Sequence, residues 1–139
     1  MLTKLIAAIA SLGFAALFAA PAAAQEDRSA GALVGHWTGM ITEQGEIPQY
    51  TLSVHISLDM SGDPVGTVEY DAFPCAGVWT NALWRGDFWS IEETITENTD
   101  RCAPQVLVTV TQRGANGLQV SLQPLGSDNP PATGMLIRR

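Results

Sequence analysis

Lysine is almost missing from this chain, and positive charge of any kind is scarce. The one lysine is Lys4, and seven Lys and Arg residues stand against fourteen Asp and Glu, which gives a formal net charge of -7 at pH 7. Binding to a nucleic-acid backbone needs clustered positive charge. The composition therefore argues against a nucleic-acid partner, favours solubility and, where a charged partner exists, favours a cationic one.

Motifs for catalysis, cofactors and metals are also missing. The chain has no glycine-rich phosphate loop, no EF-hand spacing and no G-x-S-x-G motif. Its two histidines, His36 and His55, lack metal-ligand spacing and lie far from the cysteines in sequence. We therefore expect a protein without cofactor or metal that is not an enzyme. An enzyme would need a polar cluster that converges in a pocket, for instance around Glu93.

Long hydrophobic runs are limited to the N-terminus. The apolar stretch 5–20 follows Lys4, and Ala22 and Ala24 give a small-x-small pattern. This arrangement is typical of a bacterial secretory signal peptide at residues 1–24 that is removed after Ala24. A membrane anchor is the alternative, but the run is short for a bilayer span.

The rest of the chain predicts one exported domain. We expect an N-terminal arm at 25–33 and a single domain at 34–139, which suits the size of one core. No later apolar run approaches spanning length, so we expect no membrane span in the mature chain. The expected location is the periplasm or the medium.

Cysteine is rare, and its count is even. Cys75 and Cys102 are the two cysteines, and an exported protein meets an oxidising environment. A disulfide between them would close a loop and stabilise the fold by about 3–4 kcal/mol in the chain-entropy model. A redox pair would more often show C-x-x-C spacing. We therefore predict a structural disulfide.

Strand patterns fill the remainder of the chain. Apolar and polar residues alternate in runs bounded by glycine, proline and asparagine turns. In the second run, for example, Leu52, Val54, Ile56 and Leu58 are predicted to share one face. The eight predicted strands are residues 35–43, 49–58, 64–70, 75–83, 87–96, 105–112, 118–125 and 132–139.

Eight consecutive strands with short connections predict an all-β fold, an antiparallel up-and-down barrel. Each strand must bury its apolar face, and closure removes exposed sheet edges. A two-sheet β-sandwich is the alternative. In such a barrel the third and fifth connections lie at the same end, so Cys75 and Cys102 would meet there.

Two short motifs resemble the calycin superfamily, which includes lipocalins and avidins. "GHWTG" opens the first predicted strand, and "RR" closes the last. The resemblance implies a plug in which an arginine, Arg138 or Arg139, packs over Trp37 of a Gly35-x-Trp37 motif. It also implies a barrel that carries a small apolar ligand.

Two further resemblances are coarser. The segment "GTVEYDAFPCAGVWT", residues 66–80, resembles part of small uncharacterised exported bacterial domains, some of them attached to receptor kinases. In size, export and disulfide the chain is similar to periplasmic lysozyme inhibitors. The latter resemblance implies, at the level of fold, an inhibitor of a cationic exported hydrolase.

One predicted interior position carries a charge. Side chains alternate along a strand, so Glu93 shares a face with Trp89. A buried carboxylate is costly unless it is paired. We therefore expect Glu93 to reach the barrel mouth or to meet Arg101 or another donor. Trp79, Trp89 and Glu93 are the candidates for an interior apolar pocket.

The cysteine end is predicted to be strongly acidic. Glu43, Glu46 and Asp128 fall at this end with the candidate rim residues Tyr70, Asp71, Phe73, Glu97, Asp100 and Arg101. Loops held on a rigid scaffold often carry binding function. The first functional hypothesis is a non-enzymatic binding protein whose acidic rim docks a basic protein surface. The alternatives are a calycin-like carrier of a small apolar ligand and an inhibitor of a cationic hydrolase such as lysozyme.

Overall fold

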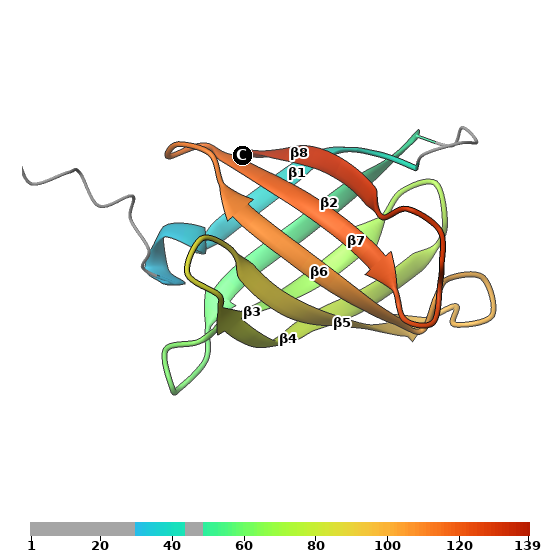
Figure 1. The fold of residues 1–139 in the computed structure, drawn as a ribbon, viewed down its shortest axis with the longest axis horizontal. Helices are drawn as coiled ribbons and strands as arrows, with labels where there is room; N and C mark the ends of the chain where they lie inside the picture. Colours follow the sequence, from blue (N-terminus) through green and yellow to red (C-terminus); the bar gives the residue numbers. More distant parts are fainter. Residues whose placement is uncertain (1–29, 44–48) are drawn as a thin grey trace, which may run out of the picture.

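The computed structural model describes residues 30–43 and 49–139. The predicted signal peptide, most of the predicted arm and Glu46 lie outside these residues. A short 3₁₀ helix, η1 (Ala30–Leu33), precedes eight strands (Figure 1): β1 (Gly35–Thr42), β2 (Gln49–Leu58), β3 (Pro64–Tyr70), β4 (Cys75–Trp84), β5 (Trp89–Glu97), β6 (Gln105–Gln112), β7 (Gly117–Pro124) and β8 (Ala132–Arg138). Within the described residues, no helix is long and apolar enough to cross a membrane.

The strands close into a barrel in the order in which they occur in the chain. Each strand pairs antiparallel with the next, and β8 returns to pair with β1. The predicted up-and-down barrel is confirmed, and the alternative of a two-sheet sandwich is wrong. Closure is the physical reason, because it pairs the edges that a sandwich of eight one-sided strands would leave open.

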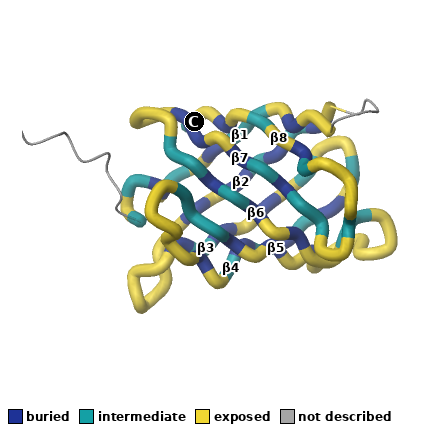
Figure 2. The backbone as a smooth tube through the Cα atoms, viewed as in Figure 1, coloured by how far each residue is buried: buried dark blue, intermediate teal, exposed yellow. Residues whose placement is uncertain are grey.

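Alternation along the strands fills the barrel interior. In β6, Val106, Val108 and Val110 are buried, whereas Gln105 and Leu107 are exposed. Figure 2 shows the same alternation of buried and more exposed positions around the barrel, with exposed loops at both ends. The interior is therefore built from the β-branched and aliphatic side chains that the two-residue period predicted.

Most predicted strand bounds agree with the structure to within one residue, and two larger details are wrong. Leu58 was expected inward, but its side chain is 42% exposed because it is the last residue of β2. The fifth strand was expected from Asp87 but begins at Trp89. Residues 85–88 form the β4–β5 turn instead, in which the Arg85 amide donates to the Phe88 carbonyl oxygen at 2.9 Å.

One end of the barrel is closed by side chains from η1, β1 and β8. We call it the plugged end and define it by Leu33, Trp37 and Arg138. Leu33 and Trp37 have no solvent exposure, and the Trp37 indole Nε1 donates to the Leu33 carbonyl oxygen at 2.8 Å. The N-terminal helix and the C-terminus both lie at this end, on the left in Figure 1.

Arg138 holds the plug in place. Its guanidinium carbon lies 4.0 Å from the centroid of the Trp37 ring. The guanidinium also donates to the carbonyl oxygens of Ala32, Val34 and Ala115 at 2.5–3.2 Å. Gly35 has φ +142°, and a Cβ there would lie 2.5 Å from Arg138 Nη1. The predicted packing of an arginine over Trp37 is therefore present, and glycine leaves the room that it needs.

Candidate functional site

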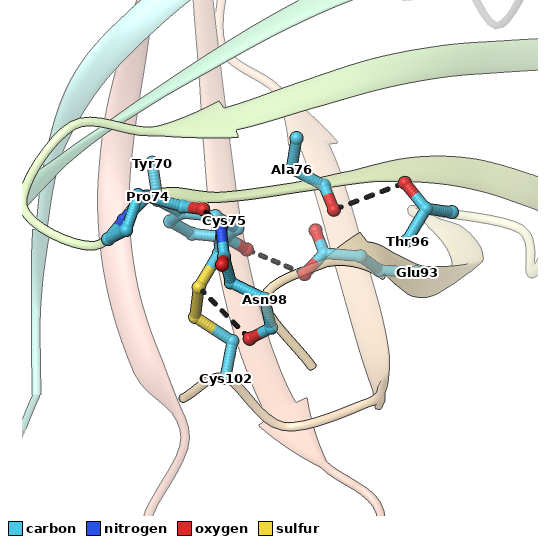
Figure 3. Close-up of a disulfide and its surroundings, with 8 residues drawn as sticks. All are labelled: Tyr70, Pro74, Cys75, Ala76, Glu93, Thr96, Asn98 and Cys102. Atoms are coloured by element: carbon cyan, nitrogen blue, oxygen red, sulfur yellow. Dashed lines mark hydrogen bonds between the residues drawn. A yellow bond between two sulfur atoms is a disulfide. The ribbon is translucent and has the colours of Figure 1, made fainter. Parts of the chain in front are cut away.

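The opposite end of the barrel is held by the disulfide, and we call it the stapled end. Cys75 begins β4, Cys102 lies in the β5–β6 connection, and their sulfur atoms are bonded with a Cα–Cα distance of 6.5 Å. Figure 3 shows this disulfide. Asn98 Nδ2 also donates to the Pro74 carbonyl oxygen, which links the same two loops. The predicted disulfide and its position at one end are confirmed.

A cavity of about 580 Å³ lies at the stapled end. This volume falls in the range of small-molecule sites, about 300–1,000 Å³. Inward-facing strand residues form its floor and walls, and loop residues form its rim. The lining residues are Glu43, Tyr50, Tyr70, Phe73, Glu93, Ile95, Arg101, Cys102, Ala103, Val106, Leu122, Pro124, Ser127, Asn129, Pro130 and Ala132.

Three aromatic side chains form one wall of the cavity. Tyr50 comes from the start of β2, Tyr70 from the end of β3, and Phe73 from the β3–β4 connection. The Tyr50 ring packs edge-on against Tyr70 at 5.6 Å and against Phe73 at 5.8 Å between centroids. Edge-to-face contacts of this kind fix ring orientation. The wall is therefore a connected aromatic surface.

Glu93 lies deep in the barrel and also lines the cavity. Its side chain is 1% exposed. Tyr70 OH donates to Glu93 Oε1 at 2.6 Å (Figure 3), and Trp79 Nε1 donates to Glu93 Oε2 at 2.7 Å. Of the two alternatives expected for Glu93, the barrel mouth or a donor, the structure shows a buried carboxylate with donors other than Arg101. Its donors are these two aromatic side chains.

Burial dominates the electrostatics of this site. It raises the pKa of Glu93 above the ordinary value of a glutamic acid, and the hydrogen bonds from Tyr70 and Trp79 lower that pKa in part. Burial, followed by the charge of Glu93, also raises the pKa of the Tyr70 hydroxyl. Tyr50 shows a raised pKa as well, from burial first and then from the charges of Glu43 and Glu93. Both tyrosines therefore remain neutral donors.

Charged side chains at the rim frame the opening. Glu43 and Arg101 line the cavity and are exposed to solvent. Asp71, Glu97 and Asp100 are exposed at the same end but do not line the cavity. Asp71 Oδ1 accepts a hydrogen bond from the Thr51 amide at 2.8 Å, so this carboxylate also orders the loop that follows β3.

The predicted site residues divide between the two ends. Tyr70, Phe73 and Arg101 line the cavity together with Glu93. Trp79 lies behind Glu93 and does not line the cavity. Trp89 does not line it either. It packs against Trp84 at the β4–β5 turn, with ring centroids 5.4 Å apart, and that turn belongs to the plugged end.

Sequence reasoning missed several walls of the cavity. Tyr50, Val106, Leu122 and Ala132 line the cavity, and none of them was predicted to belong to a pocket. A signal existed for Tyr50, because it precedes Leu52 by two residues and is the first inward residue of β2 at the cysteine end. The small side chain of Ala132 left no comparable signal.

The histidines lie outside this site. His36 and His55 face each other across β1 and β2, with ring centroids 6.2 Å apart, and both are exposed on the outer surface. In the part of the chain that the structure describes, no group of three or more His, Cys, Asp or Glu side chains is placed to hold a metal ion.

Comparisons with known proteins assign no family. No family model matches the chain, and the search of curated proteins found no match. Among solved structures, a redesigned β-barrel is similar, with a TM-score of 0.48 and 18% sequence identity. The match covers 81% of this chain and 96% of that one.

Proposed function

We propose that this protein binds a small molecule in the cavity at the stapled end of its barrel. The observation that supports the proposal is the cavity itself, about 580 Å³ with aromatic and aliphatic walls and a small number of polar groups. Ligand sites typically combine these features. Of the hypotheses drawn from the sequence, the small-ligand carrier fits a hollow stapled end best.

The same cavity favours binding over catalysis. A nucleophile needs an adjacent base, and the cavity lining includes Ser127 but no histidine. The two groups that donate to Glu93 are the Trp79 indole and the Tyr70 hydroxyl, and the raised pKa of that hydroxyl disfavours its reactive anion. Cys102 is bonded to Cys75. We therefore propose a non-enzymatic role.

We also propose that the barrel is calycin-like. The supporting observation is the plug, in which the Arg138 guanidinium lies over Trp37 next to Gly35. The proposed location is the periplasm or the medium. A disulfide is compatible with an oxidising compartment of that kind.

A fluorescent probe tests the binding proposal. N-phenyl-1-naphthylamine is uncharged, and its emission rises when it leaves water for an apolar site. Ala132→Phe places a ring where a buried methyl now lines the cavity. Thr133→Phe is the matched control, because it adds the same ring at the next, exposed position of β8. We expect the first variant to bind the probe at least about tenfold more weakly and the control to bind it like the wild type.

Two outcomes would contradict the proposal. One is that the wild type does not bind the probe saturably, which would mean that the cavity is not a site for an apolar molecule. The other is that Ala132→Phe binds the probe as tightly as the Thr133→Phe control while both remain folded by circular dichroism, which would place the binding surface outside the cavity.

The acidic rim supports a second candidate function. Glu43, Asp71, Glu97, Asp100 and Asp128 are exposed at the stapled end, against Arg101 alone among the described residues of its loops. We propose that this rim can dock a cationic protein, such as an exported hydrolase of the lysozyme type. Electrostatic association of this kind weakens as salt screens the charges.

Neutralisation of the rim tests the second candidate. The triple variant Asp71→Asn, Glu97→Gln and Asp100→Asn keeps the oxygen that accepts the Thr51 amide hydrogen bond. We expect salt-sensitive binding of lysozyme to the wild type, and at least about tenfold weaker binding to the variant. Unchanged binding by the triple variant would exclude the rim as the docking surface.

A further inference from the structure

The deepest polar group of the cavity has unused hydrogen-bonding capacity. A carboxylate offers about four acceptor positions on its two oxygens. Tyr70 and Trp79 each occupy one of them. Neither donor carries a positive charge, so the two hydrogen bonds solvate the Glu93 carboxylate without neutralising it. Glu93 lines the cavity, and a group bound there can reach it.

The charges around the cavity point to the sign of such a group. Among the residues that the structure describes, two carboxylates, Glu43 and Glu93, line the cavity against one cation, Arg101. Glu93 is buried, whereas Arg101 is exposed at the rim. A buried charge acts in a lower dielectric and is screened less than an exposed one. The field inside the cavity is therefore that of the carboxylate, and it disfavours an anion.

The aromatic wall supports the same sign. Tyr50, Tyr70 and Phe73 line the cavity beside Glu93. Aromatic rings attract cations through their quadrupole, and aromatic cages recur in sites for organic ammonium groups. Their carbon surface also suits the apolar body of such a molecule. A metal ion would prefer oxygen or nitrogen ligands to these rings.

We propose that the cavity selects organic cations, with an ammonium group that pairs with Glu93 and an apolar or aromatic body that packs against Tyr50, Tyr70 and Phe73. This inference rests on the proposed function, because it names the ligand class of the same cavity. It differs from the carrier of a neutral apolar ligand by its charge requirement.

The proposal includes a dependence on pH. The ligand-free carboxyl has a raised pKa because of its burial, and an ammonium ligand binds the charged form. Affinity should therefore fall as the pH falls through that pKa. Tyr70 and Tyr50 stay neutral because their pKa values are also raised. Within residues 30–43 and 49–139, the remaining charged groups on the cavity lining are Glu43 and Arg101.

Three ligands with one indole body test the charge requirement. Tryptamine is a cation, tryptophol is neutral and indole-3-acetate is an anion between about pH 5 and 8. We expect isothermal titration calorimetry to show that tryptamine binds at least about tenfold more tightly than tryptophol. Indole-3-acetate should bind most weakly. The advantage of tryptamine over tryptophol should shrink as the pH is lowered.

Glu93→Gln isolates the carboxylate. The amide oxygen can accept from Trp79 Nε1, and the amide nitrogen can donate to the Tyr70 oxygen, so the volume and both contacts are kept, with the direction of the Tyr70 hydrogen bond reversed. We expect this variant to bind tryptamine and tryptophol about equally and to bind tryptophol like the wild type. Glu43→Gln is the control for the rim carboxylate, and most of the preference for tryptamine should survive it.

The outcomes separate this inference from the proposed function. If tryptophol or indole-3-acetate binds the wild type as tightly as tryptamine, the charge requirement is wrong while the cavity remains a binding site. If none of the three binds and N-phenyl-1-naphthylamine fails as well, both proposals are wrong. The wild-type comparison needs no variant, so it decides the matter even if Glu93→Gln does not fold.

Discussion

The two ends of this barrel surround a charged side chain in different ways. At the plugged end, Arg138 donates to three backbone carbonyl groups and covers the Trp37 ring. At the stapled end, Glu93 accepts from two side chains and faces a cavity. The first charge lies between fixed partners and closes its end. The second has two donors and lines a cavity, and its remaining acceptor positions leave capacity for a ligand.

The covalent and non-covalent restraints are divided in the same way. The plugged end is held by packing around Trp37, which has no solvent exposure. The stapled end has a hollow in place of such a plug, and the Cys75–Cys102 disulfide joins two of its loops. The difference indicates that a barrel end either fills with side chains or needs another restraint if it is to stay open.

Of the changes that test the difference between the two ends, removal of the plug should lower the stability of the protein most. Trp37→Ala deletes a fully buried indole and should lower the free energy of unfolding by about 3–5 kcal/mol. Urea denaturation followed by far-UV circular dichroism measures the change. Trp84→Ala, at a 37% exposed position, is the control and should cost less. A loss below about 1 kcal/mol for Trp37→Ala would contradict the role of the plug.

Removal of the staple should have the next largest effect. The cysteines are 27 residues apart, and replacing both by alanine should lower the free energy of unfolding by about 3–4 kcal/mol in the chain-entropy model. The same variant should bind N-phenyl-1-naphthylamine more weakly, because Cys102 and Phe73 line the cavity. Reduction of the wild type by dithiothreitol provides an independent check. Equal urea midpoints for the reduced and oxidised protein would refute the prediction.

A smaller effect is expected from Arg138→Gln. The change removes a guanidinium group that donates to three carbonyl oxygens and lies over the Trp37 ring. We expect the free energy of unfolding to fall by about 1–3 kcal/mol. Arg139→Gln is matched in chemistry and one residue away, at an exposed position. It should change stability by no more than about 0.5 kcal/mol. Similar losses for the two variants would show that Arg138 acts only through net charge.

The smallest effect on stability is expected from Glu93→Gln, because the substitution keeps the side-chain volume and the hydrogen-bonded contacts with Tyr70 and Trp79. Burial raises the pKa of Glu93 in the folded protein. The stability that this proton contributes is complete below the pKa of an exposed glutamic acid, about 4.3, and is lost as the pH rises through the higher folded-state pKa. Glu93→Gln does not show this loss of stability, because glutamine carries no titratable proton.

Urea denaturation at several pH values measures the difference between the two proteins. The stability of Glu93→Gln relative to the wild type should increase from acid to neutral pH. Glu92→Gln is the control, because Glu92 is exposed on the outer face of the same strand. A relative stability of Glu93→Gln that does not vary with pH would mean that burial does not shift the pKa of Glu93.

Much of the fold could be predicted because the alternation of apolar and polar residues indicates both that a segment is a strand and which of its faces is buried. The period of two in Val106, Val108 and Val110 predicted both a strand and its inward face. The odd and even ordering of the connections then placed Cys75 and Cys102 at one end. The errors at Leu58 and Asp87 fall at strand ends, where the face of a residue no longer decides its burial.

The candidate site was less predictable. The alternation placed Glu93 inside, but donors from other strands could not be read from its own strand. Tyr70 lies 23 residues away and Trp79 lies 14 residues away. Trp89 shares a face with Glu93 on β5, yet it packs at the other end of the barrel. Whether a residue belongs to the site therefore depends on its position along the barrel axis as much as on whether it faces inward or outward.

The sequence by itself determined the strands, the faces that they bury and the pairing of the cysteines, because these features follow from local periodicity and from the order of the connections. The arginine over Trp37 was implied by the resemblance to the calycin superfamily. The tertiary structure alone decided that the stapled end is hollow and that Glu93 meets Tyr70 and Trp79. The reason is geometric. The space inside a barrel depends on how side chains from all eight strands fill each layer, and this cannot be read from the sequence of any one strand.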